Sequence, residues 1–192
     1  MRKASLLLAF SFAMLIPAFG QGQPAARKID NEFVQQQFGD QFTFLPEFAP
    51  SFGDLDGDGV EDVVIAARCK NALLDQAEHK YTVLDPYNEF FGYGNPKVTT
   101  TFSEGIPELR GLVMLVIHGA EKDGWRSATP KAKYVIVNLP YRTVSVRKMR
   151  LKKTTVEAIY VEEAGEMGDS SAVFFDGKKL KYRYVPMGGS MQ

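Results

Sequence analysis

Most of what can be inferred about this chain begins at Asp54-Leu55-Asp56-Gly57-Asp58-Gly59-Val60-Glu61-Asp62, which runs directly into Val63-Val64-Ile65-Ala66-Ala67. Aspartates at relative positions one, three and five, with a glycine at position six, let the backbone wrap so that successive carboxylates face one hard cation. The apolar run that follows is rich in β-branched residues and predicts a buried strand. We therefore expect a carboxylate loop at the entrance to a strand.

The loop predicts a site for one Ca²⁺ ion, which accepts about six to eight oxygen ligands at flexible angles. The candidate donors are the carboxylates of Asp54, Asp56, Asp58 and Asp62 and the main-chain carbonyl of Val60. Magnesium is the less favoured ion because it prefers a tighter octahedron and usually keeps several waters. The alternative interpretation is a solvated turn without a metal, since Asp and Gly favour turns for local reasons.

The loop departs from an EF-hand because position twelve is Ile65, where that motif has a bidentate glutamate, and because a strand follows it. The segment Phe52–Ile65 instead resembles the calcium loop of FG-GAP and VCBS-type repeats, known from the β-propellers of integrin α-chains and from many secreted bacterial proteins. A fainter likeness covers residues 111–119 and 123–125, which resemble the later strand and turn of such a repeat. The resemblance implies the same five calcium donors. It does not imply a propeller, because the chain has one such loop.

Other apolar segments predict a mainly β chain. The expected strands lie at 112–117, 134–137, 144–146 and 158–161, and a C-terminal hairpin pairs 172–175 with 180–185 around a tight Asp176-Gly177 turn. Helices are expected at 31–38, capped by Asp30 or Asn31 and closed by Gly39, and within 71–78. We therefore predict a single sheet-rich α+β domain over residues 30–188, with the repeat-like loop at 52–67, and not a complete β-propeller.

The N-terminus predicts export. Arg2 and Lys3 precede an apolar stretch from Leu6 to Ile16, and small residues follow it up to Gly20. We expect a signal peptide over residues 1–20 that is cleaved after Gly20, and a flexible leader over 21–29. The apolar stretch is shorter than the roughly 20 residues that span a bilayer. The expected location is therefore secreted or periplasmic, without a stable membrane span.

The charge balance argues against nucleic acid as a partner. Lys+Arg and Asp+Glu both total 23, so the formal net charge is +0 and no global field attracts a polyanion. Basic residues gather at 142–153 and 178–183, where alternation with apolar residues predicts solvated sheet faces. One cysteine, Cys69, excludes an internal disulfide and is expected to be a buried, unreactive thiol.

No catalytic residue is predicted, because the only histidines, His79 and His118, have no spacing that indicates a shared site, and no nucleophile motif is present. The leading hypothesis is a secreted noncatalytic domain that binds one calcium ion, in adhesion or envelope interactions with an extracellular protein or polysaccharide. One alternative, a calcium-dependent secreted hydrolase, requires a histidine beside carboxylates in a concave pocket. The other, a polysaccharide-binding module, requires Tyr87, Tyr93 or Trp125 to be exposed together. In the aromatic loop 87–93, Phe90 and Phe91 are expected to cover the core.

Overall fold

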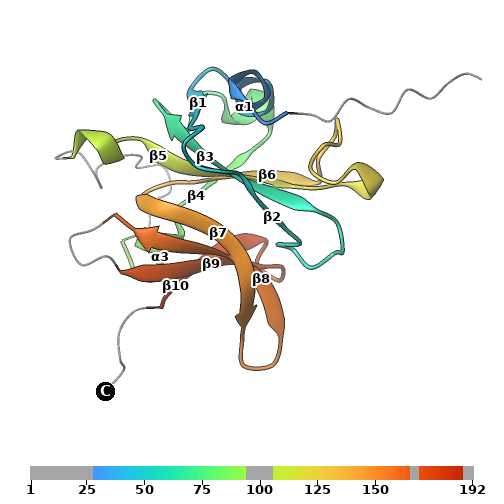
Figure 1. Cartoon of the computed structure of the whole chain (residues 1–192), viewed down its shortest axis with the longest axis vertical. Helices are drawn as coiled ribbons and strands as arrows, with labels where there is room; N and C mark the ends of the chain where they lie inside the picture. Colours follow the sequence, from blue (N-terminus) through green and yellow to red (C-terminus); the bar gives the residue numbers. More distant parts are fainter. Residues whose placement is uncertain (1–27, 94–105, 165–168, 188–192) are drawn as a thin grey trace, which may run out of the picture.

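The computed structural model describes residues 28–93, 106–164 and 169–187, which form two stacked β-sheets with a helix over the outer face of the first (Figure 1). The elements of the first half are α1 (Asn31–Phe38), β1 (Phe42–Phe44), β2 (Ser51–Gly53), β3 (Asp62–Cys69), α2 (Gln76–His79), β4 (Thr82–Leu84), α3 (Pro86–Phe90), β5 (Leu112–His118) and β6 (Ala132–Ile136). Those of the second half are β7 (Tyr141–Arg150), β8 (Thr155–Glu163), β9 (Ser170–Asp176) and β10 (Lys181–Pro186). Short 3₁₀ helices lie at Pro107–Leu109 and Glu121–Asp123. The predicted sheet-rich α+β class is confirmed.

The first sheet has the strand order β1-β3-β5-β6-β4, with β2 paired to the start of β3. Its central strands β3 and β5 are buried along nearly their whole length because both faces of the sheet are covered. On β3, Val63 and Ile65 pack in the core beneath α1, whereas Val64 and Ala66 pack in the core shared with the second sheet. This two-sided burial explains why the sequence shows a continuous apolar run here instead of an alternating one.

The second sheet is antiparallel throughout and has the order β10-β9-β8-β7. The predicted C-terminal hairpin is confirmed, since β9 and β10 pair with Asp176 opposite Lys181. The predicted tight Asp176-Gly177 turn is wrong: residues 177–180 form the connection, and the positive φ of 51° belongs to Leu180. The physical reason is the bond from the Lys179 N–H to the Asp176 carbonyl, which closes a longer turn.

Helix α1 covers the predicted range, and its N-terminus is capped as expected by Asp30, whose carboxylate accepts the Phe33 N–H at 3.0 Å. The expected helix within 71–78 is only the single turn of α2, which begins at Gln76 and ends at His79. The predicted signal peptide lies outside the described residues, as does most of the leader. No helix in the described part of the chain is long and apolar enough to cross a membrane.

Candidate metal centre

The Asp-rich loop connects β2 to β3 at one end of the first sheet (Figure 1). It brings together one carboxylate oxygen from each of Asp54, Asp56 and Asp58, and these oxygens all lie within 4.8 Å of one another. Gly57 and Gly59 make the turn with φ values of 77° and 84°, which side chains with a Cβ rarely adopt. The predicted wrapping of the three alternating aspartates is therefore present.

Backbone amides of the loop hold all three of these carboxylates in place, and Asp56 Oδ1 accepts the Asp58 N–H at 3.2 Å. The two oxygens of Asp54 accept the N–H groups of Asp58 at 3.0 Å and Gly59 at 2.9 Å. The carboxylate of Asp58 in turn accepts the Val60 N–H at 2.9 Å. From the second sheet, the Glu157 carboxylate accepts the Asp54 N–H at 2.6 Å. Hydrogen bonds from its own backbone and to a residue of β8 thus fix the loop independently of a metal ion.

Asp62, the fourth predicted carboxylate ligand, lies outside this three-aspartate cluster. It is fully buried, and its two oxygens accept the backbone N–H groups of Leu55 and Gly119, each at 2.8 Å. Burial raises the pKa of Asp62 to about 7, although the two amide donors act in the opposite direction. Asp62 therefore ties the loop to the end of β5. Val60, whose carbonyl is the fifth predicted donor, directs its N–H to Asp58 within the loop.

The residue that sequence reasoning missed is Lys131, which precedes β6. Its Nζ lies 2.6 Å from Asp56 Oδ2 and 2.6 Å from Asp58 Oδ2. These two hydrogen bonds raise the pKa of Lys131, and the same lysine lowers the pKa of Asp58. An ammonium group therefore neutralises part of the carboxylate cluster. No local sequence signal links Lys131 to the loop, because the contact depends on β6 returning beside it.

His118 lies behind the loop at the end of β5. Its Nδ1 is 3.4 Å from Asp56 Oδ2, and its Nε2 is 2.7 Å from the Tyr182 hydroxyl. Because a carboxylate can only accept, the ring proton belongs on Nδ1, and Nε2 then accepts from Tyr182. Burial lowers the pKa of His118 to about 4 even though the Asp56 charge opposes this shift, so the imidazole is neutral near pH 7.

This histidine satisfies only part of the arrangement that a hydrolase requires. It lies beside a carboxylate, but its side chain is 1% exposed, with Tyr134 and Phe175 rings at centroid distances of 5.0 and 4.7 Å. A hollow of about 330 Å³ opens next to the loop and is lined by Asp54 and Asp56 among others, but not by His118. The other histidine, His79, lies at the end of α2 and lines a different hollow.

Trp125 does not belong to an exposed aromatic surface of the kind that polysaccharide binding requires, whereas Tyr93 is 79% exposed and Tyr87 is half-buried. Trp125 is buried at 3% exposure, and its indole N–H donates to Glu61 at 2.7 Å, so it shares no exposed surface with Tyr93. The expectation that Phe90 and Phe91 cover the core is met only at its edge, since both rings are half-exposed and lie against Tyr184, a buried residue of the core between the sheets. Helix α3, capped by Asp85, places both residues at the rim of this core.

The thiol of Cys69 is buried, as expected, and burial raises its pKa to about 12, so it is unreactive near neutral pH. No family model, curated protein or solved structure matches the chain. The resemblance of the loop to FG-GAP and VCBS-type repeats therefore stays a prediction from the loop residues.

Proposed function

We propose that the chain is an exported, noncatalytic domain that binds one calcium ion through Asp54, Asp56 and Asp58, with Asp62 and the Val60 carbonyl as further donors. The observation that carries this proposal is the convergence of three aspartate oxygens within 4.8 Å of one another. Carboxylate oxygens gathered in a glycine-containing loop suit a hard divalent cation. The resemblance of the loop to known calcium loops favours calcium, and we place the domain in adhesion or envelope interactions.

Metal binding to this loop is a replacement of one cation by another. The Lys131 ammonium already contacts Asp56 and Asp58, where it donates hydrogen bonds from a single positive charge. Calcium carries two charges and collects oxygens from several directions, so it can draw in Asp54 together with the other two carboxylates. Lys131 thus holds the loop together when calcium is scarce and competes with the ion when calcium is present.

The noncatalytic part of the proposal is supported by the surroundings of His118. Both ring nitrogens have partners in Asp56 and Tyr182, and aromatic rings enclose the imidazole. A general acid or base must come within hydrogen-bond reach of the group that it protonates or deprotonates. The enclosure of His118 favours a role in supporting the loop over a role in proton transfer to a substrate.

Thermal unfolding in calcium and in chelator tests the metal site. Binding to the folded state stabilises it by about 2.7 kcal/mol when calcium is 100-fold above Kd, so the unfolding temperature should rise. Asp58→Asn, at an exposed ligand position, should remove most of that rise. The matched control is Asp40→Asn, an exposed aspartate after α1, which should keep the full response. Superimposable wild-type curves with and without calcium would contradict the proposal.

A second experiment measures calcium affinity in Lys131→Gln by calorimetry. Removal of the competing ammonium should tighten calcium binding by about tenfold, because the ion no longer displaces a charge-assisted contact. Lys179→Gln removes the same charge from the exposed end of the C-terminal hairpin and should leave the affinity unchanged. Equal affinities in all three proteins would place the ion away from Asp56 and Asp58.

Export has its own test. The protein is expressed with its complete N-terminus in a bacterial host, and the mass of the protein recovered outside the cytoplasm is measured. The proposal predicts a chain that begins at Gln21. An uncleaved chain that stays in the cytoplasm would contradict export without bearing on the calcium site.

A further inference from the structure

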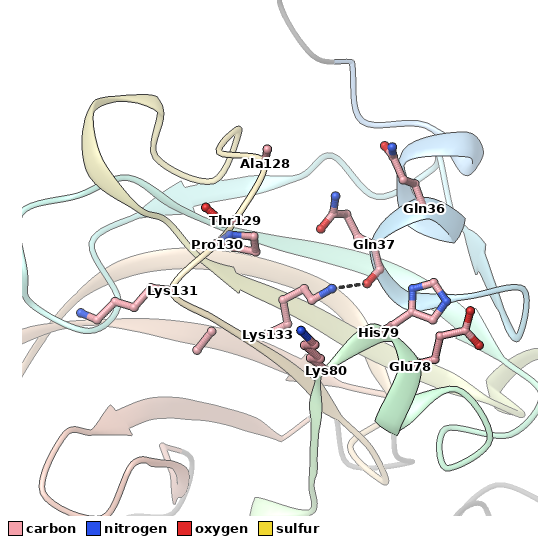
Figure 2. Close-up of a pocket in the computed structure, with 11 residues that line it drawn as sticks. Gln36, Gln37, Glu78, His79, Lys80, Ala128, Thr129, Pro130, Lys131 and Lys133 are labelled. Carbon is pink, nitrogen blue, oxygen red and sulfur yellow. Dashed lines mark hydrogen bonds between the residues drawn. The ribbon is translucent and has the colours of Figure 1, made fainter.

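A second hollow, of about 630 Å³, lies between the end of α1, the end of α2 and the segment that leads into β6 (Figure 2). It is separate from the Asp-rich loop, whose three clustered aspartates do not line it. The polar and charged residues of its wall are Gln36, Gln37, Glu78, His79, Lys80, Thr129, Lys131 and Lys133. Three lysines against one glutamate give the wall an excess of positive charge, so the hollow has the character of an anion site.

Lys133 stands at the centre of this wall. The side chain is half-buried, its Nζ lies 5.5 Å from the centroid of the Phe38 ring, and the ammonium donates to the main-chain carbonyl of Gln37 (Figure 2). An ammonium group has three N–H donors, and one carbonyl satisfies only one of them. The remaining donors of a partly desolvated charge are therefore available to a ligand in the hollow.

Lys80 adds a second positive charge to the wall of the same hollow. Burial, together with the nearby Lys80 charge, lowers the pKa of Lys133 from 10.5 to about 8. Among the described residues, neither lysine has a carboxylate within ion-pair distance, in contrast to Lys131 and Lys181. Two ammonium groups that face the same space without a counter-ion repel each other, and a bound anion would relieve that repulsion.

Glu78, the acidic residue closest in sequence to Lys80, does not supply this counter-charge. Glu78 also lines the hollow, but its carboxylate lies on the far side of the His79 ring from the lysine ammonium groups (Figure 2). The Lys131 ammonium points away from the hollow toward the Asp-rich loop (Figure 2), where Asp56 and Asp58 hold it. Lys80, Lys133 and the imidazole of His79 are thus left to receive an anion.

We propose that this hollow binds a tetrahedral oxyanion, a phosphate or sulfate group, either free or carried as an ester on a small molecule. Lysine ammonium groups act as point charges that suit the evenly distributed oxygens of such a group, whereas planar carboxylates are better matched by the fork of arginine. The Thr129 residue in the wall offers a neutral hydroxyl donor and acceptor. The volume exceeds that of one small anion and lies in the range of pockets for small molecules, so there is room for the rest of an ester.

The test is an NMR titration of the isotope-labelled protein with inorganic phosphate. A calcium chelator is present, the ionic strength is constant, and the backbone amide signals of Lys80 and Lys133 are followed. We expect saturable shifts at both residues. Lys80→Gln, at an exposed position, should weaken phosphate binding by about tenfold through loss of one charge-assisted contact. Lys133→Gln should do the same, and Lys179→Gln is the matched control with unchanged affinity. The spectra of the variants report directly whether each one is folded.

Two further titrations distinguish the source and the class of the anion. Tighter binding of glucose 6-phosphate than of phosphate or glucose alone supports an ester ligand, and equal binding of phosphate and its ester supports the free anion. Acetate that produces the same shifts at the same concentration would overturn the assignment to a tetrahedral oxyanion. Phosphate affinity that is unchanged in folded Lys80→Gln, or shifts that never saturate, would overturn the site itself.

Discussion

The hydroxyl of Tyr182 provides the buried His118 imidazole with its second hydrogen-bond partner. Tyr182→Phe leaves Nε2 of His118 without a donor in a space lined by aromatic rings. An unsatisfied buried polar group costs about 1 to 3 kcal/mol, so we expect the free energy of unfolding to fall by that amount. The measurement is urea-induced unfolding at neutral pH.

Tyr160→Phe is the matched control for this change, because Tyr160 lies on β8 of the same sheet and its ring contacts Arg147 without a hydrogen bond from its hydroxyl among the described residues. We expect its unfolding free energy to stay within about 0.5 kcal/mol of wild type. A Tyr182→Phe variant as stable as Tyr160→Phe would show that the Nε2 atom of His118 finds another partner.

Lys133 makes the stability of the chain depend on pH in the alkaline range. Its pKa is about 8 in the folded chain and 10.5 as the ordinary value, so between these pH values the unfolded chain binds more protons. The free energy of unfolding should therefore rise with pH in this window, whereas below it Lys133 is protonated in both states and adds no pH dependence. Because the ammonium is partly solvated, we expect a gain of only about 1 kcal/mol between about pH 8 and about pH 9.5.

Lys133→Met removes the titrating group but keeps an unbranched apolar side chain beside Phe38. The comparison is urea unfolding of both proteins across the same pH range, and the quantity of interest is the difference between their unfolding free energies. As the pH rises, the unfolding free energy of wild type should increase relative to that of Lys133→Met. A constant difference would mean that the pKa of Lys133 is close to its ordinary value.

At the residue scale, the sequence was sufficient for those parts of the candidate metal site that lie close together in the chain. Asp54, Asp56 and Asp58 were predictable because a loop of this spacing must gather them whatever the rest of the fold does. Lys131 reaches Asp58 from 73 residues away, and His118 reaches Asp56 from the end of another strand. Such contacts follow from strand order, which a single sequence does not specify.

At the scale of elements, Gly111 determines how closely β3 and β5 can pair at their outer end. It has a φ of +70°, and an added Cβ would overlap the carbonyl oxygen of Cys69, the residue whose N–H donates to the Gly111 carbonyl at 2.7 Å. Gly111→Ala should therefore lower the free energy of unfolding by about 2 to 4 kcal/mol through backbone strain and the steric overlap.

Gly177→Ala is the control for that change, because no atom lies within 4 Å of an added Cβ at this position and its φ is not positive. Thermal unfolding of the two variants should show a large loss for Gly111→Ala and little change for Gly177→Ala. Equal melting temperatures would contradict the close approach of Gly111 to Cys69.

The elements that the sequence predicted are those with a local cause. Helix α1 has a side-chain cap at Asp30, and the strands β3 and β5 are continuous apolar runs. The tight turn at Asp176-Gly177 failed because turn preference competes with the pairing register of the two strands. Strand β4 was missed for a related reason: it has 3 residues and is held by parallel pairing with β6, a contact distant in sequence.

At the scale of the whole molecule, the two sheets depend on a shared core. Apolar runs in β3 and β5 indicated that both faces of the first sheet are covered, but not that a second sheet covers one of them. In the structure, Val64 and Met114 of the first sheet pack in one cluster with Ile159 and Val173 of the second. The Tyr141 hydroxyl of β7 also donates to the Val113 carbonyl of β5 at 2.8 Å. We therefore expect the two sheets to unfold together.

The single tryptophan, Trp125, makes this testable because it lies in the other core, beneath α1. Ile159→Ala removes a fully buried side chain from β8 and should lower the free energy of unfolding by about 2 to 4 kcal/mol. If the sheets form one cooperative unit, Trp125 fluorescence and far-ultraviolet circular dichroism should give the same reduced midpoint in urea. Thr155→Ala, an exposed change on the same strand, should leave both midpoints near wild type. A fluorescence midpoint that stays at the wild-type value while the dichroism midpoint falls would show that the second sheet unfolds independently of the core beneath α1.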